Sequence, residues 1–305
     1  MTPTLPHAIR FRLEQDPALP TLPAVAQRIV AFWKDGALPE VVDVARVVAD
    51  DPAMAAKVLR YANSAAFALR QPARTVSQAV TMLGPRQVRN VVLSFALVAF
   101  AKGKGTAYRS FWRRSVLASV FARELTALDR WTGLPGEEAA LAALLQDIGS
   151  LAFMTVLGEV YEVLVLETGT NHAALATVEQ ERMGVDHCEI GAWLLQRWNF
   201  PDDLVRAVAL SHGRTDGGDD AIARLGRLSA IAGVLADAWI EGGSAQTLKN
   251  NGHGAGFRNA DPLKAALARA EIGITEAAGL FNVEGCEAPN MDSLAEQARQ
   301  LIENG

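Results

Sequence analysis

The sequence predicts an all-α protein, a bundle of many helices, and three observations support this fold class. Apolar residues recur at helical spacing almost throughout the 305 residues, and no alternating run indicates a strand. Half of the residues are hydrophobic and 21% are charged, which is typical of a globular protein with a sizeable core. Aromatic residues make up only 7% and alanine is frequent, so we expect helices that pack closely through small side chains.

The first third of the chain carries clear signals for where helices begin and end. These are an N-cap followed by proline (Asp51, Pro52), a capping box (Thr75, Gln78) and a glycine–proline boundary (Gly84, Pro85). Apolar positions at helical spacing lie between them, from Val41 to Leu97. The segment is therefore predicted to be a bundle of short, tightly paired helices.

A Gly/Lys-rich stretch from Lys102 to Thr106 marks a boundary, and longer helices follow it. They are predicted at Tyr108–Leu128, Glu137–Ile148, His187–Trp198, Asp202–His212 and Ala221–Ile240. The glycine-rich residues 241–261 are expected to form a flexible surface loop. Helical periodicity resumes at Pro262 and continues to the C-terminus, with a break around Glu284–Pro289.

Charge is distributed unevenly along the chain. The formal net charge is −5, yet residues 52–123 contain twelve Lys or Arg and no Asp or Glu, so the remainder carries −17. Such an asymmetry requires a partner of opposite sign. We favour the acidic remainder of the same protein as that partner, and nucleic acid, a nucleotide or an acidic protein stay as alternatives.

The sequence predicts a cytoplasmic protein without a membrane segment. Residues 1–10 lack the features of a signal peptide, and the best apolar stretch, Val88–Ala101, is too short and is interrupted by polar residues. The two cysteines, Cys188 and Cys286, offer no framework of paired spacings, which fits a reducing compartment.

Three polar residues lie on apolar helical stripes and are expected to converge between helices. They are Asp147, His187 and His212. Bundle proteins place metal and cofactor sites in such positions, but three ligands without a close i, i+3 or i, i+4 pair form a weak metal motif. Each histidine alone is more often a hydrogen-bonded core residue. Asp147 alone could cap a neighbouring helix or pair with Arg114.

Several motifs, in order, resemble those of the HDOD domain family. They are Leu19-Pro-Thr-Leu-Pro-Ala-Val-Ala26, Asp50-Asp-Pro52, Lys57-Val-Leu-Arg-Tyr-Ala-Asn-Ser64, Ser77-Gln-Ala-Val-Thr-Met-Leu-Gly84, Phe111-Trp-Arg-Arg-Ser115, Leu144-Leu-Gln-Asp-Ile-Gly149, Asp186-His-Cys-Glu-Ile-Gly-Ala-Trp193, Trp198-Asn-Phe-Pro-Asp202 and Leu210-Ser-His212. The resemblance covers roughly residues 19–240.

The resemblance implies an HDOD domain at 19–240, with an N-terminal helical subdomain (19–105) packed on an HD-domain-like helical subdomain (106–240). An N-terminal extension (1–18) precedes it, and the loop (241–261) and C-terminal helices (262–305) follow. HDOD proteins are bacterial signalling modules related to the HD and HD-GYP metal-dependent phosphohydrolases.

Aligned on these motifs, the chain lacks several metal ligands of the enzymes. Arg114 stands at the position of the first histidine, Gln146 replaces the histidine of the His-Asp doublet, and the late aspartate falls near Gly233. Asp147, His187 and His212 are retained, and no GYP signature is present. Arginine is a permanent cation that does not ligate metals, so we expect no bound metal, no cofactor and no catalytic residues.

The resulting hypothesis is a non-catalytic signal-transduction protein that acts through contacts with other signalling proteins, with Arg86 and Arg89 as a candidate interaction face. Three alternatives stay open. The first is a sensor of a nucleotide or second messenger, with Arg114 holding phosphate. The second is a nucleic-acid-binding regulator that uses the basic segment 52–123. The third is residual metal-dependent phosphohydrolase activity.

Overall fold

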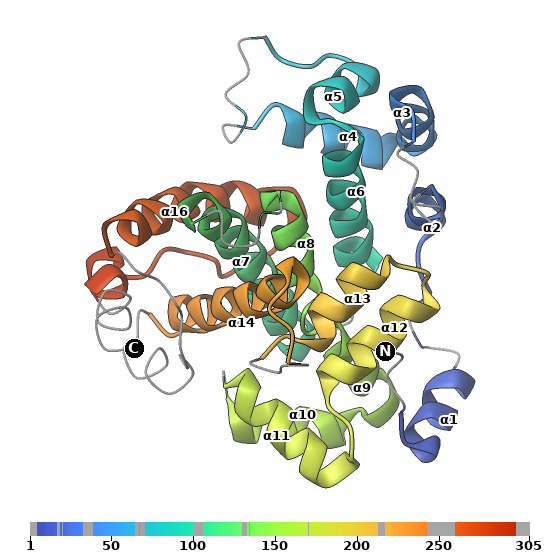
Figure 1. Ribbon diagram of the computed structural model, residues 1–305, viewed down its shortest axis with the longest axis vertical. Helices are drawn as coiled ribbons and strands as arrows, with labels where there is room; N and C mark the ends of the chain where they lie inside the picture. The colour runs from blue at the N-terminus through green and yellow to red at the C-terminus, as the bar shows by residue number, and fades with distance from the viewer. Residues whose placement is uncertain are drawn as a thin grey trace.

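The computed structural model consists of helices, and no strand occurs among the residues that it describes (Figure 1). These residues are 5–16, 19, 21–32, 39–64, 67, 71–100, 106–129, 133, 135–169, 171–212, 217–242 and 260–296. The predicted all-α class is confirmed.

The first six helices include the predicted N-terminal bundle. They are α1 (His7–Gln15), α2 (Ala24–Ala31), α3 (Val41–Ala49), α4 (Pro52–Ala62), α5 (Val76–Leu83) and α6 (Pro85–Phe100). Helices α3, α4 and α5 gather at one end of the molecule, and α6 runs from them towards its centre (Figure 1). Helix α1 lies apart from this bundle and packs against α9 (Ile148–Leu157).

Local sequence signals fixed the helix boundaries of this bundle. The Asp51 carboxylate accepts hydrogen bonds from the backbone N–H groups of Ala53 and Met54, as an N-cap does. Thr75 and Gln78 form the reciprocal capping box. These caps satisfy backbone donors that the first helical turn leaves free, so they act without help from tertiary contacts.

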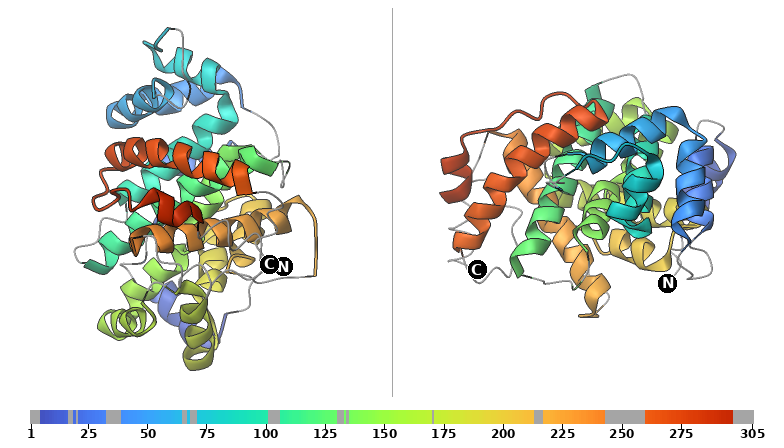
Figure 2. Two further views of the ribbon diagram at one scale, coloured as in Figure 1. Left: turned by 90° about the vertical axis from the view of Figure 1, so that its left-hand side faces the viewer. Right: turned by 90° about the horizontal axis from the view of Figure 1, so that it is seen from above.

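The second part of the chain builds the centre and the opposite end of the molecule. Its other helices are α7 (Thr106–Asp129), α8 (Gly136–Leu145), α10 (Glu159–Thr168), α11 (His172–Met183), α12 (His187–Arg197), α13 (Asp202–Ala209), α14 (Ala221–Ile240) and α16 (Ala260–Phe281). Helix α7 is central: α8, α14 and α16 all pack against it (Figures 1 and 2). Helices α12 and α13 form a further pair that packs on α9 and α14.

Two predicted helices end earlier than their periodicity suggested. The helix expected at Glu137–Ile148 stops at Leu145, and the chain turns at Gln146 and Asp147 before α9 begins. The helix expected at Asp202–His212 stops at Ala209, and His212 has a positive φ of 60°. Both early ends place polar residues at helix termini. The predicted loop at 241–261 lies almost wholly outside the described residues.

One stretch, Gly136–Leu157, is long and apolar enough by length and composition to cross a membrane. It differs from the best candidate in the sequence, Val88–Ala101. It spans α8, the turn and α9, and 78% of its most apolar part is buried inside the protein, as in the core helices of a folded domain.

Gly149, in the first turn of α9, allows α12 to cross at very short distance. A Cβ atom on Gly149 would lie 2.0 Å from the backbone oxygen of His187 and 2.6 Å from the backbone nitrogen of Gly191. Backbone atoms cannot move aside as flexible side chains do. The close crossing brings His187 beside the turn that carries Asp147.

We predict that Gly149→Ala destabilises the protein by about 3 kcal/mol or more, because the methyl group forces two backbones apart. Gly279→Ala is the matched control, since Gly279 is helical and exposed and a Cβ there meets nothing within 4 Å. The free energy of unfolding of the control should rise by up to about 1 kcal/mol, because alanine has a higher helix propensity than glycine. Urea unfolding of both variants measures the difference, and equal stabilities would contradict the close crossing.

Candidate functional site

The centre of the candidate site is a buried guanidinium that is shared by two carboxylates. Arg114 of α7 forms a charge-assisted hydrogen bond to Asp147 at the α8–α9 turn. It also binds Asp237 of α14 with two bonds, 2.7 Å from Nε to Oδ1 and 3.0 Å from Nη2 to Oδ2. All three side chains are at most 5% exposed. The interaction therefore joins three helical segments inside the core.

Asp237 was not identified from the sequence, where the late aspartate was aligned near Gly233. Gly233 is one helical turn earlier on α14 and lies against the same group: a Cβ there would be 2.7 Å from Arg114 Nη2 and 3.0 Å from Gln146 Oε1. The glycine thus leaves room for the guanidinium. Asp237, one turn further along α14, supplies an acidic partner for Arg114 that the sequence analysis did not name.

Three histidines surround Oδ1 of Asp147, whereas Arg114 binds Oδ2. His212 Nε2 lies 2.7 Å from Asp147 Oδ1, and His172 Nδ1 and His187 Nε2 each lie 3.5 Å from the same oxygen. The three imidazole rings contact one another, with centroids 4.8–6.1 Å apart. His172, the first residue of α11, was not among the predicted site residues.

A second buried carboxylate holds His187 in place. Glu179 Oε2 accepts from the backbone N–H of His187 at 2.8 Å and lies 2.6 Å from its Nδ1. The Tyr161 hydroxyl donates to Glu179 Oε1 at 2.6 Å and lies 2.9 Å from Ser150 Oγ. Since Nδ1 faces Glu179, the ring presents Nε2 towards Asp147. This arrangement is the one by which carboxylates orient metal-binding histidines.

Electrostatics separate the groups of the site into different protonation states. Burial opposes the charge on Asp147, but Arg114 and the imidazoles outweigh it and hold the pKa of Asp147 well below its usual range. Burial raises the pKa of Asp237 to about 7, although Arg114 lowers it. The single positive charge of Arg114 thus stabilises the full negative charge of one carboxylate, and that carboxylate is Asp147 rather than Asp237.

The three histidines also differ from one another in their protonation state. Burial, aided by the nearby Arg114 charge, lowers the pKa of His172 to about 4, and burial also lowers the pKa of His212. Burial opposes the charge on His187 as well, but Glu179 outweighs it and raises the pKa of His187 well above its usual value. At neutral pH the site therefore contains neutral His172 and His212 beside a charged His187.

Four side chains could hold a metal ion: one ligand atom each from Asp147, His172, His187 and His212 lies within 4.8 Å of the others. His172 Nδ1 and His187 Nε2 are buried without a hydrogen-bond partner in the protein. His212 adopts a left-handed backbone conformation that costs a non-glycine residue about 1–2 kcal/mol. These residues fit one cation bound by nitrogen and oxygen, and Arg114 occupies the space towards Asp237.

The structure brings together every residue that the alignment singled out. Arg114, Gln146, Asp147, His187, His212 and Gly233 all belong to one buried cluster. The pairing of Arg114 with Asp147 is confirmed. The sequence named Asp147, His187 and His212 as residues that converge, and the structure adds His172 to them. Glu179 and Asp237 were also not identified from the sequence. Asp237 lies one helical turn after Gly233, so the periodicity of the predicted helix could have identified it as a site residue. No motif in the sequence around His172 or Glu179 marks either of them as a site residue.

The candidate interaction face at Arg86 and Arg89 lies beside an acidic residue. Both guanidinium groups approach Glu138 of α8, at 3.9 and 3.8 Å. The Arg89 side chain is only 14% exposed, whereas that of Arg86 is 61% exposed. Arg114 and Arg123 of the basic segment also pair with acidic residues of the same chain. In these pairs, acidic residues of the same chain are partners of cations in the basic segment. Arg86 is more accessible to solvent than Arg89.

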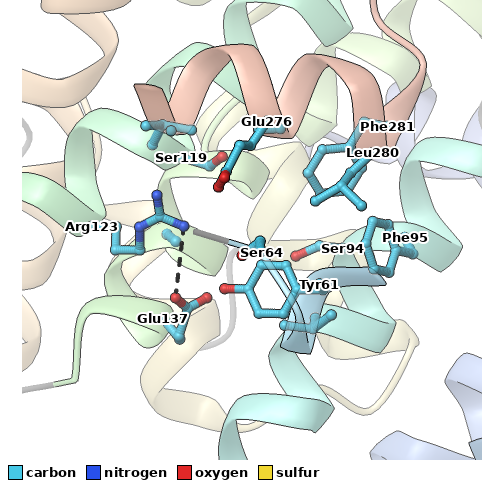
Figure 3. Close-up of a pocket in the computed structure, with 15 residues that line it drawn as sticks. Tyr61, Ser64, Ser94, Phe95, Ser119, Arg123, Glu137, Glu276, Leu280 and Phe281 are labelled. Atoms are coloured by element: carbon cyan, nitrogen blue, oxygen red, sulfur yellow. Dashed lines mark ion pairs between the residues drawn. The ribbon is translucent and has the colours of Figure 1, made fainter. Parts of the chain in front are cut away.

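A separate polar cavity lies where α4, α6, α7, α8 and α16 meet (Figure 3). Arg123 and Glu137 face each other across it at 4.0 Å, and the Tyr61 hydroxyl points towards them. Tyr61 Oη and Ser64 Oγ are buried without a protein partner. The cavity offers ≈ 40 Å³ to water-sized molecules, room for about three waters. We interpret it as a hydrated junction rather than a ligand site.

The helical architecture and the buried Asp147 cluster define an HD-like protein. The model of the HDOD domain matches residues 19–214 of this chain. The chain therefore belongs to the HDOD domain family.

Solved structures of low sequence identity share the fold. One is a candidate phosphohydrolase from Shewanella amazonensis SB2B, with a TM-score of 0.63 and 23% identity over 95% of this chain and 98% of that chain. Another is an HDOD domain protein of unknown function from Geobacter sulfurreducens, with a TM-score of 0.62 and 22% identity over 97% and 94%. A third is a candidate signal transduction protein from Marinobacter aquaeolei VT8, with a TM-score of 0.63 and 20% identity over 90% and 65%.

A curated relative is an uncharacterized protein from Treponema pallidum (strain Nichols), 23% identical over 216 residues. The match covers 69% of this chain and 40% of that protein, so the chain spans about two fifths of the relative's length.

We predict that His172 makes stability sensitive to acid. Its pKa is about 4 in the folded state, below the ordinary 6.5, so the unfolded chain binds the proton first as pH falls from 6.5 to 4. Folding stability from this group is present above pH 6.5 and lost over that interval, up to about 3 kcal/mol. His172→Gln should flatten this part of the curve of unfolding free energy against pH. His7→Gln, on exposed α1, is the control, and a wild-type slope in His172→Gln would contradict the assignment.

Proposed function

We propose that this HDOD protein is a non-catalytic bacterial signal-transduction module that acts through protein contacts. The observation that supports the proposal best is Arg114, which bridges Asp147 and Asp237 in the place where the related enzymes have a metal ligand. A guanidinium there supplies the positive charge that a metal ion would supply, but it can neither ligate nor activate water.

Gln146 and Asp237 also argue against metal-dependent catalysis. Gln146 offers a neutral amide at the doublet position, and its Oε1 is buried without a hydrogen-bond partner. Asp237 is engaged by two hydrogen bonds to Arg114 and is therefore not open for a metal. A hydrolase of this type needs several free ligands and an open position for the attacking water. What the buried cluster does provide is a rigid connection between α7, α9 and α14.

The test is a hydrolase assay with bis(p-nitrophenyl) phosphate and p-nitrophenyl phosphate in the presence of Mn²⁺ or Mg²⁺. We expect wild-type rates equal to those of the protein-free control. Arg114→His/Gln146→His, which restores two imidazoles, should bind more metal per chain than the wild type when both are measured by elemental analysis. Metal-dependent turnover by the wild type that is lost in Asp147→Asn would refute the proposal.

A second candidate function is supported by the four donors on the histidine side of Asp147. Nδ1 of His172 and Nε2 of His187 suit one cation, such as Zn²⁺, held for structure or for sensing, and the cation displaces the proton that His187 carries on Nε2. The Glu179 carboxylate holds Nδ1 of His187 and so keeps Nε2 directed at the cation. The neutral forms of His172 and His212 are the forms that bind metals. The charge of Arg114 close to Asp147 opposes this binding.

If this second function holds, Zn²⁺ added in slight excess to metal-free protein raises the midpoint of thermal unfolding, because a ligand of the folded state stabilises it. His172→Ala should abolish most of the shift and His7→Ala should preserve it. Titration calorimetry should give one site per chain. Equal shifts in both variants would assign the effect to binding elsewhere.

A further inference from the structure

Helix α10 exposes an apolar stripe. Val160, Val163 and Leu166 are 72%, 54% and 80% exposed, and they follow one another at intervals of three residues. They account for three of the seven exposed large hydrophobic residues in the described part of the chain. Residues three apart lie on one side of a helix, so the three side chains form a continuous surface, which we call the α10 stripe. Clustered apolar exposure of this kind marks interaction surfaces.

Helix α10 is anchored to the protein through the face opposite the α10 stripe. Tyr161 and Leu164 are buried on its inner side, and the Tyr161 hydroxyl is bound to Glu179 of α11. Gly158 and Gly169, both with positive φ, terminate the helix at its two ends. The stripe is therefore presented in a fixed conformation, and a partner that binds it does not have to order the helix first.

The charged residues of α10 itself are all acidic. The sequence of α10, EVYEVLVLET, contains Glu159, Glu162 and Glu167 and no basic residue. All three glutamates are exposed, and Glu167 pairs with Arg182 of the neighbouring α11. Helix α4, which carries Lys57 and Arg60, lies at the opposite end of the molecule from α10 (Figure 1), so these two cations do not neutralise the glutamates of α10.

We propose that the α10 stripe is a docking surface for a basic amphipathic helix of another protein. Apolar residues of that helix cover Val160, Val163 and Leu166, and its Lys or Arg residues pair with the flanking glutamates, as in helix pairs with charged edges. A second copy of this chain is a poorer occupant, because pairing α10 with itself places glutamates opposite glutamates.

The probe is a synthetic helical peptide of about 18 residues with leucine at helical spacing on one face and lysine on the other. Binding is measured by fluorescence anisotropy with the full chain. We expect saturable binding that Val163→Glu/Leu166→Glu weakens at least tenfold. Val42→Glu is the matched control, since Val42 is 60% exposed on α3 beside Glu40 and Asp43. It should leave binding unchanged.

Two peptide controls separate docking from simple charge attraction. A scrambled peptide of the same composition keeps the charge but loses the apolar face, and an acidic version replaces lysine with glutamate. Both should bind at least tenfold more weakly than the probe. Circular dichroism must show that Val163→Glu/Leu166→Glu is folded, which we expect because both side chains are exposed. Equal binding of the scrambled peptide, equal loss in Val42→Glu, or no binding of the probe at all would each overturn the proposal.

Discussion

The ion pairs of Arg114 with Asp147 and Asp237 are the interaction on which the centre of this protein depends. They connect α7, the α8–α9 turn and α14, and they place one permanent charge in the core. Removing one partner of a buried ion pair leaves the other without compensation, which typically costs about 3–5 kcal/mol. The guanidinium of Arg114 thus holds these three segments together in the core.

The same arrangement explains the uneven protonation of the site. One guanidinium between two carboxylates favours a full charge on only one of them, and Asp147 keeps it because the histidines also surround it. Glu179 in turn fixes His187 and is itself bound by Tyr161 of α10. A continuous chain of hydrogen bonds therefore leads from the buried cluster to the helix whose outer face carries the α10 stripe.

Much of the fold followed from local rules. The caps at Asp51 and Thr75 and the boundary at Gly84 were predicted because each satisfies or frees backbone groups within a few residues. The helix Ala221–Ile240 was placed at its observed limits by periodicity alone. The turn at Gln146–Asp147 was not predicted, because the apolar periodicity runs on across it and tertiary packing of α9 on α12 decides where the helix stops.

The sequence by itself determined the helical class, the HDOD motifs and the presence of Arg114 and Gln146 within two of those motifs. These depend on residue type and on short spacings that a single chain displays. Tertiary structure alone decided which groups meet: Asp237 comes from α14, far from Arg114 in the sequence, and α11 brings both His172 to Asp147 and Glu179 to His187. It also decided that Val160, Val163 and Leu166 face outward, since an apolar residue in a helix is ordinarily expected to be buried.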